Sequence, residues 1–169
     1  DKAMNSGEWA DTVSYAYIQP SVSSSFLSPS GLVRINIDKA GVDEPVAVFI
    51  DEENINTITE RNASDIYQLI PTINFSPKNI VLKNKGEISF DINEYLTPDI
   101  YDWQYVIMEM NDNGYEQLTT YFSDGKVSAH IHTLSSFAVY VNLNITRPIP
   151  TTFKLQQNYP NPFNPSTTI

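Results

Sequence analysis

Residues 117–131 read QLTTYFSDGKVSAHI, and this stretch decides the fold of the chain. Two runs rich in β-branched and aromatic residues flank the step Asp124-Gly125. An Asp-Gly step suits the tight turn of a β-hairpin, because that turn needs positive φ at both central positions. The stretch therefore predicts that Gln117–Phe122 pairs across Ser123-Asp124-Gly125 with Lys126–Ile131.

Strand signals continue on both sides of this hairpin. Downstream, Ser136–Val141 places Phe137, Val139 and Val141 on one face, since successive side chains of a strand alternate. Upstream, Gln104–Met110 reads as a strand that ends at the turn Asp112-Asn113-Gly114. These segments extend the hairpin into an antiparallel sheet.

The rest of the first 142 residues repeats this pattern. The apolar run Ile80–Leu82 is followed by Lys83-Asn84-Lys85-Gly86 and then by Glu87–Ile92, with Ile88, Phe90 and Ile92 inward. Shorter runs are Val13–Gln19, Leu32–Ile37, Val46–Ile50 and Ile66–Ile70. Short strands at this spacing, with no long helix, predict an all-β fold: an antiparallel β-sandwich over residues 12–142, with helix below roughly a tenth of the chain. Expected core residues are Val33, Ile35, Ile88, Phe90, Val127, Phe137 and Val139.

Composition excludes several classes of function. The formal charge of −10 over 169 residues gives a surface that repels phosphate backbones, so we expect no nucleic-acid partner. No run of about 18 apolar residues exists, so we expect no membrane span. The absence of cysteine excludes thiol catalysis and zinc-thiolate sites. Asp1-Lys2-Ala3-Met4 lacks the apolar core of a signal peptide, and we expect the chain to be a piece of a longer protein.

Residues 66–142 carry an ordered series of features. Phe75-Ser76-Pro77 precedes an apolar strand, Gly114–Leu118 and Val127–Ile131 follow, and Leu134-Ser135-Ser136-Phe137-Ala138-Val139 comes last. This series resembles the β-sandwich of netrin receptors and ankyrins, which also occurs in bacterial surface proteins. Leu27–Val33 is similar to the first strand of that family.

Some relatives of that family cut themselves at this ending, and the resemblance places the bond at Leu134–Ser135. There a hydroxyl attacks the preceding carbonyl with a His two positions earlier as base. This chain has Thr133 at the base position, and His132 lies one residue away, on the opposite strand face. We therefore predict that the bond stays intact and that Ser135 belongs to a structural turn.

Other candidate sites have simpler interpretations. His130 and His132 share a strand face but lack a third histidine, so we expect two solvent-exposed side chains and no metal. Asp51-Glu52-Glu53 and Asn111-Asp112-Asn113 could supply oxygens to calcium, although neither has the repeat of a calcium loop. No other cofactor is expected. An aromatic binding platform could come from Tyr15, Tyr17, Tyr101, Trp103, Tyr105, Tyr115 and Tyr121, although alternating Tyr is ordinary on a sandwich face.

Composition changes after Asn142. Residues 143–169 hold Pro148, Pro150, Pro160, Pro162 and Pro165, a density that no ladder strand tolerates. We therefore expect a sandwich over 1–142, a linker over 143–150 and a separate element over 151–169. Because proline fixes φ and extends the residue before it, this tail should be extended or turn-rich and never helical. We expect it to dock on residues 1–142 or on a neighbouring molecule, which would cover its aromatic rings, or else to be poorly ordered.

The tail is the most specific stretch of the chain. Phe153–Ile169, with Asn158-Tyr159-Pro160-Asn161-Pro162-Phe163-Asn164-Pro165 at its centre, resembles the beginning of the C-terminal sorting domain of type IX secretion cargo in the Bacteroidetes and related phyla. Such domains continue for several more strands, so we expect the signal here to be incomplete. The resemblance implies a secreted or outer-surface bacterial protein whose tail engages the type IX machinery.

Three functions follow from these observations. The first is a non-catalytic accessory spacer of a larger secreted or cell-surface protein, for example a hydrolase such as a peptidase, to whose N-terminal domain it is covalently linked. The second is a module that binds carbohydrate or protein, which three or more coplanar exposed aromatics in one groove or patch would favour. The third is the self-cleaving sandwich. We expect no enzyme, because no Gly-x-Ser-x-Gly elbow or Ser-His-Asp set is present.

Overall fold

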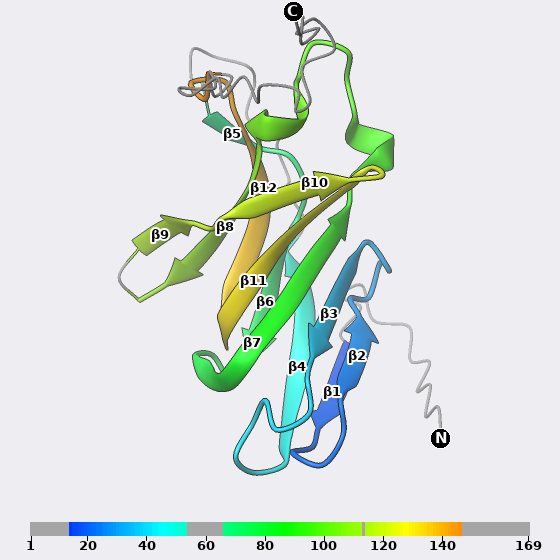
Figure 1. Ribbon diagram of the computed structural model, residues 1–169, viewed down its shortest axis with the longest axis vertical. Helices are drawn as coiled ribbons and strands as arrows, with labels where there is room; N and C mark the ends of the chain where they lie inside the picture. Colours follow the sequence, from blue (N-terminus) through cyan, green and yellow to red (C-terminus); the bar gives the residue numbers. More distant parts are fainter. Residues whose placement is uncertain (1–13, 54–65, 113, 147–169) are drawn as a thin grey trace, which may run out of the picture.

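Two antiparallel sheets packed against each other form the fold of the computed structural model (Figure 1). The structure describes residues 14–53, 66–112 and 114–146. Within these ranges 61% of residues lie in strands and no α-helix occurs. The only helical turns described there are η1 (Asn93–Tyr95) and η2 (Asp102–Gln104). The predicted all-β sandwich is therefore confirmed.

The first sheet, sheet A, has seven strands. Its order is β1 (Ser14–Ile18), β4 (Val46–Glu53), β6 (Thr72–Ser76), β12 (Ser136–Asn142), β8 (Tyr105–Asn111) and β9 (Gly114–Gln117). The short strand β5 (Ile66–Gln68) also pairs with β12, beyond the end of β6. Because β12 lies between β5 and β6 on one side and β8 on the other, it forms the centre of the sheet.

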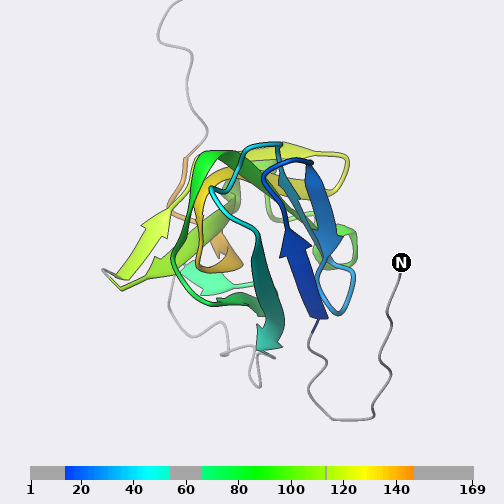
Figure 2. The same ribbon diagram turned by 90° about the horizontal axis from the view of Figure 1, so that it is seen from below.

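The second sheet, sheet B, has five strands. Its order is β10 (Thr120–Ser123), β11 (Lys126–Leu134), β7 (Ile80–Asp91), β3 (Val33–Ile37) and β2 (Ser24–Leu27). Viewed along the sandwich, the two sheets enclose the interior between them (Figure 2).

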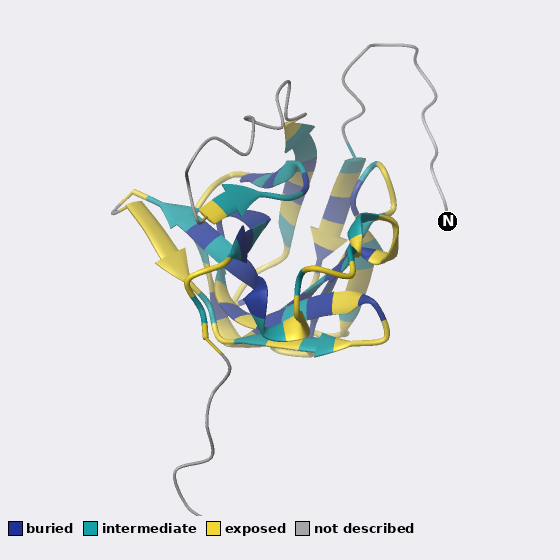
Figure 3. Cartoon of the chain, turned by 90° about the horizontal axis from the view of Figure 1, so that it is seen from above, coloured by how far each residue is buried: buried dark blue, intermediate teal, exposed yellow. Residues whose placement is uncertain are grey.

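The core lies between the sheets, where buried residues alternate with exposed ones along the strands (Figure 3). All seven predicted core residues are buried, with exposed fractions of at most 1%. Phe75 of β6 and Phe137 of β12 meet edge to face with ring centroids 6.1 Å apart. Burial of this apolar surface is the main force that holds the two sheets together.

The Asp124-Gly125 turn forms as predicted. Asp124 and Gly125 have φ values of 51° and 70°, and Ser123 pairs with Lys126 across them. The positive φ favours glycine here, and a Cβ on Gly125 would lie 1.9 Å from the end of the Asn93 side chain, which would have to move.

The predicted strand Gln117–Phe122 is wrong in its extent. Gln117 ends β9, which pairs with β8 in sheet A, whereas β10 begins at Thr120 and belongs to sheet B. Between them, the Leu118 N–H donates to the Ile107 carbonyl at 2.9 Å. The Thr120 hydroxyl accepts from the Ile107 N–H at 3.1 Å and donates to the Leu118 carbonyl at 3.1 Å. These bonds satisfy the backbone where the chain changes sheets.

Residues 80–92 also differ from the expected pattern. Lys83-Asn84-Lys85-Gly86 does not separate two strands, because β7 runs unbroken from Ile80 to Asp91. The irregularity lies in β7 itself, because its residues 82–85 fall between the pairs Gly86–Ile131 and Val81–Thr133, where β11 has only His132. Such a bulge bends a strand without ending it.

Candidate functional site

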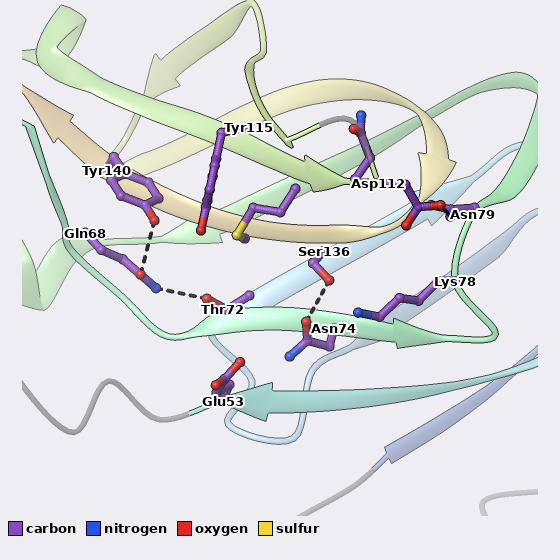
Figure 4. A pocket seen from close by; sticks show the side chains of 12 residues that line it. Glu53, Gln68, Thr72, Asn74, Lys78, Asn79, Asp112, Tyr115, Ser136 and Tyr140 are labelled. Atoms are coloured by element: carbon purple, nitrogen blue, oxygen red, sulfur yellow. Dashed lines mark hydrogen bonds between the residues drawn. The ribbon is translucent and has the colours of Figure 1, made fainter.

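A groove on the outer face of sheet A is the concave feature that we consider as a site (Figure 4). It exists because β12 points Phe137, Val139 and Val141 into the core and Ser136 and Tyr140 to the other side. Its volume of about 440 Å³ falls within the range of about 300–1,000 Å³ typical of small-molecule sites. Residues from β4, β5, β6, β8, β9 and β12 line it, together with the β6–β7 and β8–β9 turns.

Side-chain hydrogen bonds fix the floor of the groove. The Ser136 hydroxyl donates to Asn74 Oδ1 at 2.7 Å. The Tyr140 hydroxyl contacts Gln68 Oε1 at 3.3 Å. Gln68 Nε2 in turn donates to the Ile70 carbonyl at 2.8 Å and to Thr72 Oγ1 at 3.0 Å (Figure 4). The floor therefore has two separate hydrogen-bonded groups, Ser136 with Asn74 and Tyr140 with Gln68 and Thr72, which orient these side chains before any ligand arrives.

The rim of the groove carries charge and one exposed ring. Asn79 Nδ2 donates to Asp112 Oδ2 at 3.0 Å, which joins the β6–β7 and β8–β9 turns. Tyr115 on β9 stands beside the groove with 69% of its surface exposed. Burial raises the pKa of the Tyr140 hydroxyl, and the nearby Tyr115 phenol raises it further. Tyr140 thus remains a neutral hydrogen-bond donor at physiological pH.

The two acidic runs considered for calcium come together only in part. Glu52 is occupied, because its carboxylate accepts the Ser30 hydroxyl at 2.6 Å and the Ser30 N–H at 3.2 Å. Glu53 and Asp112 line the same groove. Among the described residues, no group of three or more His, Asp or Glu side chains could hold a metal ion.

Both histidines are exposed on β11, as predicted. The ring of His130 meets the edge of Tyr121 with centroids 6.1 Å apart, on the outer face of sheet B. Neither histidine lies in the groove.

The seven candidate aromatics do not form one platform. Tyr105 lies in the core, Tyr15 and Tyr17 are exposed on β1, and Tyr121 belongs to sheet B. Tyr101 and Trp103 stack on each other with centroids 4.6 Å apart, where Trp103 lies in η2 and Tyr101 immediately precedes it. Only Tyr115 lines the groove, together with Tyr140, which the sequence did not single out.

Leu134 and Ser135 lie where the chain passes from β11 in sheet B to β12 in sheet A. The Ser135 hydroxyl donates to Glu109 Oε1 at 2.6 Å, and the Thr133 hydroxyl donates to the same oxygen. The Leu134 carbonyl accepts the Asn79 N–H at 2.8 Å. Glu109 and Ser135 are both buried, so the carboxylate ties this crossing to β8.

Sequence reasoning missed Glu109. Its signal was present, because Tyr105, Ile107 and Glu109 occupy alternate positions of β8 and all three are buried. An acidic residue in phase with core residues needs hydrogen-bond donors. A carboxylate on the Ser135 hydroxyl can act as an acceptor for the proton of a nucleophile, but it equally satisfies two buried hydroxyls at a turn.

The sorting motif Asn158–Pro165 and the expected linker lie outside the described residues, apart from the linker's first four positions. The last described strand ends at Asn142. No helix in the described ranges is long and apolar enough to cross a membrane. A comparison with protein-family models gave no match, and none of the curated proteins matches the chain either.

Proposed function

We propose that this chain is a non-catalytic accessory module of a larger secreted or cell-surface bacterial protein. In this role the sandwich spaces an N-terminal functional domain from a type IX sorting signal. The observation that carries the proposal is the order of the two parts: an all-β sandwich precedes Phe153–Ile169, whose sequence resembles the start of that signal.

One feature of the sandwich supports a spacing role. Its interior is one continuous apolar cluster contributed by both sheets. Such a core makes a rigid unit that holds its neighbours at a fixed separation.

The test is a secretion assay in a bacterium that has a type IX system. A reporter is fused to residues 143–169, with and without the native continuation of the chain. We expect export only with the continuation, because the signal resembles the first part of a longer domain. Failure of the restored fusion to export the reporter would remove the sorting assignment.

A second test replaces Tyr159 and Phe163 by alanine in the fusion that contains the native continuation. These rings are costly to leave in water, so we expect the secretion machinery or the rest of the sorting domain to bury them. Their loss should therefore retain the reporter in the cell.

A further inference from the structure

We propose that the groove on the outer face of sheet A binds a segment of a neutral polysaccharide. This goes beyond the spacing role, which needs no ligand. Most of the side chains that line the groove are polar, and Tyr115 of β9 and Tyr140 of β12 add two aromatic rings.

The position of the groove favours a sugar over a peptide strand. A peptide that joins a sheet uses the free backbone groups of an edge strand. The floor here is β12 with β6 and β8 on either side, where the backbone groups are occupied by the ladders. A ligand therefore meets side chains only, and it must be recognised by amide and hydroxyl groups.

The chemistry of those side chains matches sugar hydroxyls. A sugar hydroxyl donates and accepts at once, and so do the amides and hydroxyls of Asn, Gln, Thr, Ser and Tyr taken together. Asn74 is one such amide. Its Oδ1 accepts a hydrogen bond from the Ser136 hydroxyl, and its Nδ2 makes no hydrogen bond with any described residue. Asn74 therefore presents a fixed donor to the groove.

Charge argues that the polysaccharide is neutral. The lining contains Glu53 and Asp112 against Lys78, and Asp112 is already engaged by Asn79. The formal net charge of the whole chain is −10, so the protein repels a polyanion. No concentration of positive charge in the groove offsets that repulsion.

Tyr115 supplies the apolar contact. Its ring is exposed on β9, a strand whose four residues are all exposed, and Figure 4 shows it standing over the groove near Tyr140. The face of an aromatic ring is negative and attracts the positive C–H bonds on the flat side of a sugar ring. Tyr115 thus stacks on the sugar ring while the polar side chains of the floor form hydrogen bonds with its hydroxyls.

The experiment is native gel electrophoresis of the full chain through gels that contain one polysaccharide each. The probes are the neutral polymers xyloglucan, glucomannan, laminarin and dextran, and the anionic polymer polygalacturonate. We expect at least one neutral polymer to retard the chain and polygalacturonate not to retard it. Retardation by none of the neutral polymers, or by polygalacturonate alone, would overturn the proposal.

Point variants place the binding in the groove. Tyr115→Ala should weaken binding about tenfold or more, equivalent to about 1.4 kcal/mol. Tyr121→Ala is the matched control, because Tyr121 is similarly exposed (56%) but lies on sheet B. Equal losses in the two variants would contradict the groove as the site.

Two further variants test the donor and the charge, with thermal melting to verify folding. Asn74→Asp keeps the acceptor for Ser136 and removes the donor, so binding should fall by a similar factor. Lys78→Gln should change binding by less than about threefold, since a neutral ligand does not need the ammonium. Loss of binding in Lys78→Gln with full binding in Asn74→Asp would show an anion site and refute the proposal.

Discussion

The buried Glu109 carboxylate should stabilise the crossing between the two sheets. Ser135 is 1% exposed, and its hydroxyl donates to Glu109 at 2.6 Å. A hydrogen bond to a charged group contributes about 1.5–3 kcal/mol, against about 0.5–1.5 kcal/mol for a neutral one. Ser135→Ala should therefore lower the free energy of unfolding by about 1.5–3 kcal/mol. Each kcal/mol lowers Tm by about 2–4 °C in a chain of this size.

Ser128→Ala provides the matched control for this effect. Ser128 lies on β11, and its hydroxyl donates to the neutral Ser89 hydroxyl at 3.0 Å. Its loss should be about half that of Ser135→Ala, because the acceptor carries no charge. Urea titration followed by tryptophan fluorescence measures both free energies. Equal losses would refute the argument, since they would show that the Ser135 bond is no stronger than a neutral one.

Three further predictions concern the same region of the sandwich and its phenols. Intact-mass measurement of freshly purified protein should give one species; two fragments that meet at Leu134–Ser135 would instead make Glu109 the missing base. Tyr105→Phe should leave stability unchanged or raise it by up to about 1 kcal/mol, because the enclosed Tyr105 hydroxyl lies near Thr97 without forming a hydrogen bond of normal geometry; a clear loss of Tm would contradict this. Burial raises the pKa of the Tyr105 and Tyr140 hydroxyls above 10.0, so their contribution is complete below pH 10.0 and is lost as the pH rises through the folded-state pKa. Urea titrations at alkaline pH should show this fall, and it should be smaller in Tyr140→Phe.

Local patterns were sufficient to predict the class of fold and its core. The Asp124-Gly125 step located a hairpin, because its two positive φ values are a property of the turn itself. The period of two located the inward residues, because every strand of a sandwich has one face in the core. Both signals are contained within a few neighbouring residues, and both predictions are confirmed.

The assignment of strands to sheets could not be read in this way. Gln117–Phe122 has the composition of one strand, but the chain changes sheets at Leu118 and Thr119. What decides the change is the bonding of Leu118 and Thr120 to Ile107, which belongs to β8 and not to the adjacent strand β9. Alternation gives the face of a residue within its sheet and does not specify which sheet that is.

The groove depends on contacts that are still more distant in the chain. Ser136 meets Asn74 across 62 positions, and Tyr140 meets Gln68 across 72. Each residue alone is an ordinary outward-facing polar side chain, so nothing in its neighbourhood marks it. One feature does carry information: Ser136 and Ala138, on the outer face of β12, are buried although they do not face the core. Of these two, Ser136 lines the groove, and a larger side chain there would fill part of the hollow that Tyr115 and Asp112 border. The hollow therefore depends on the small size of the β12 side chain at its floor. Its polar character depends on side chains from the other strands of sheet A.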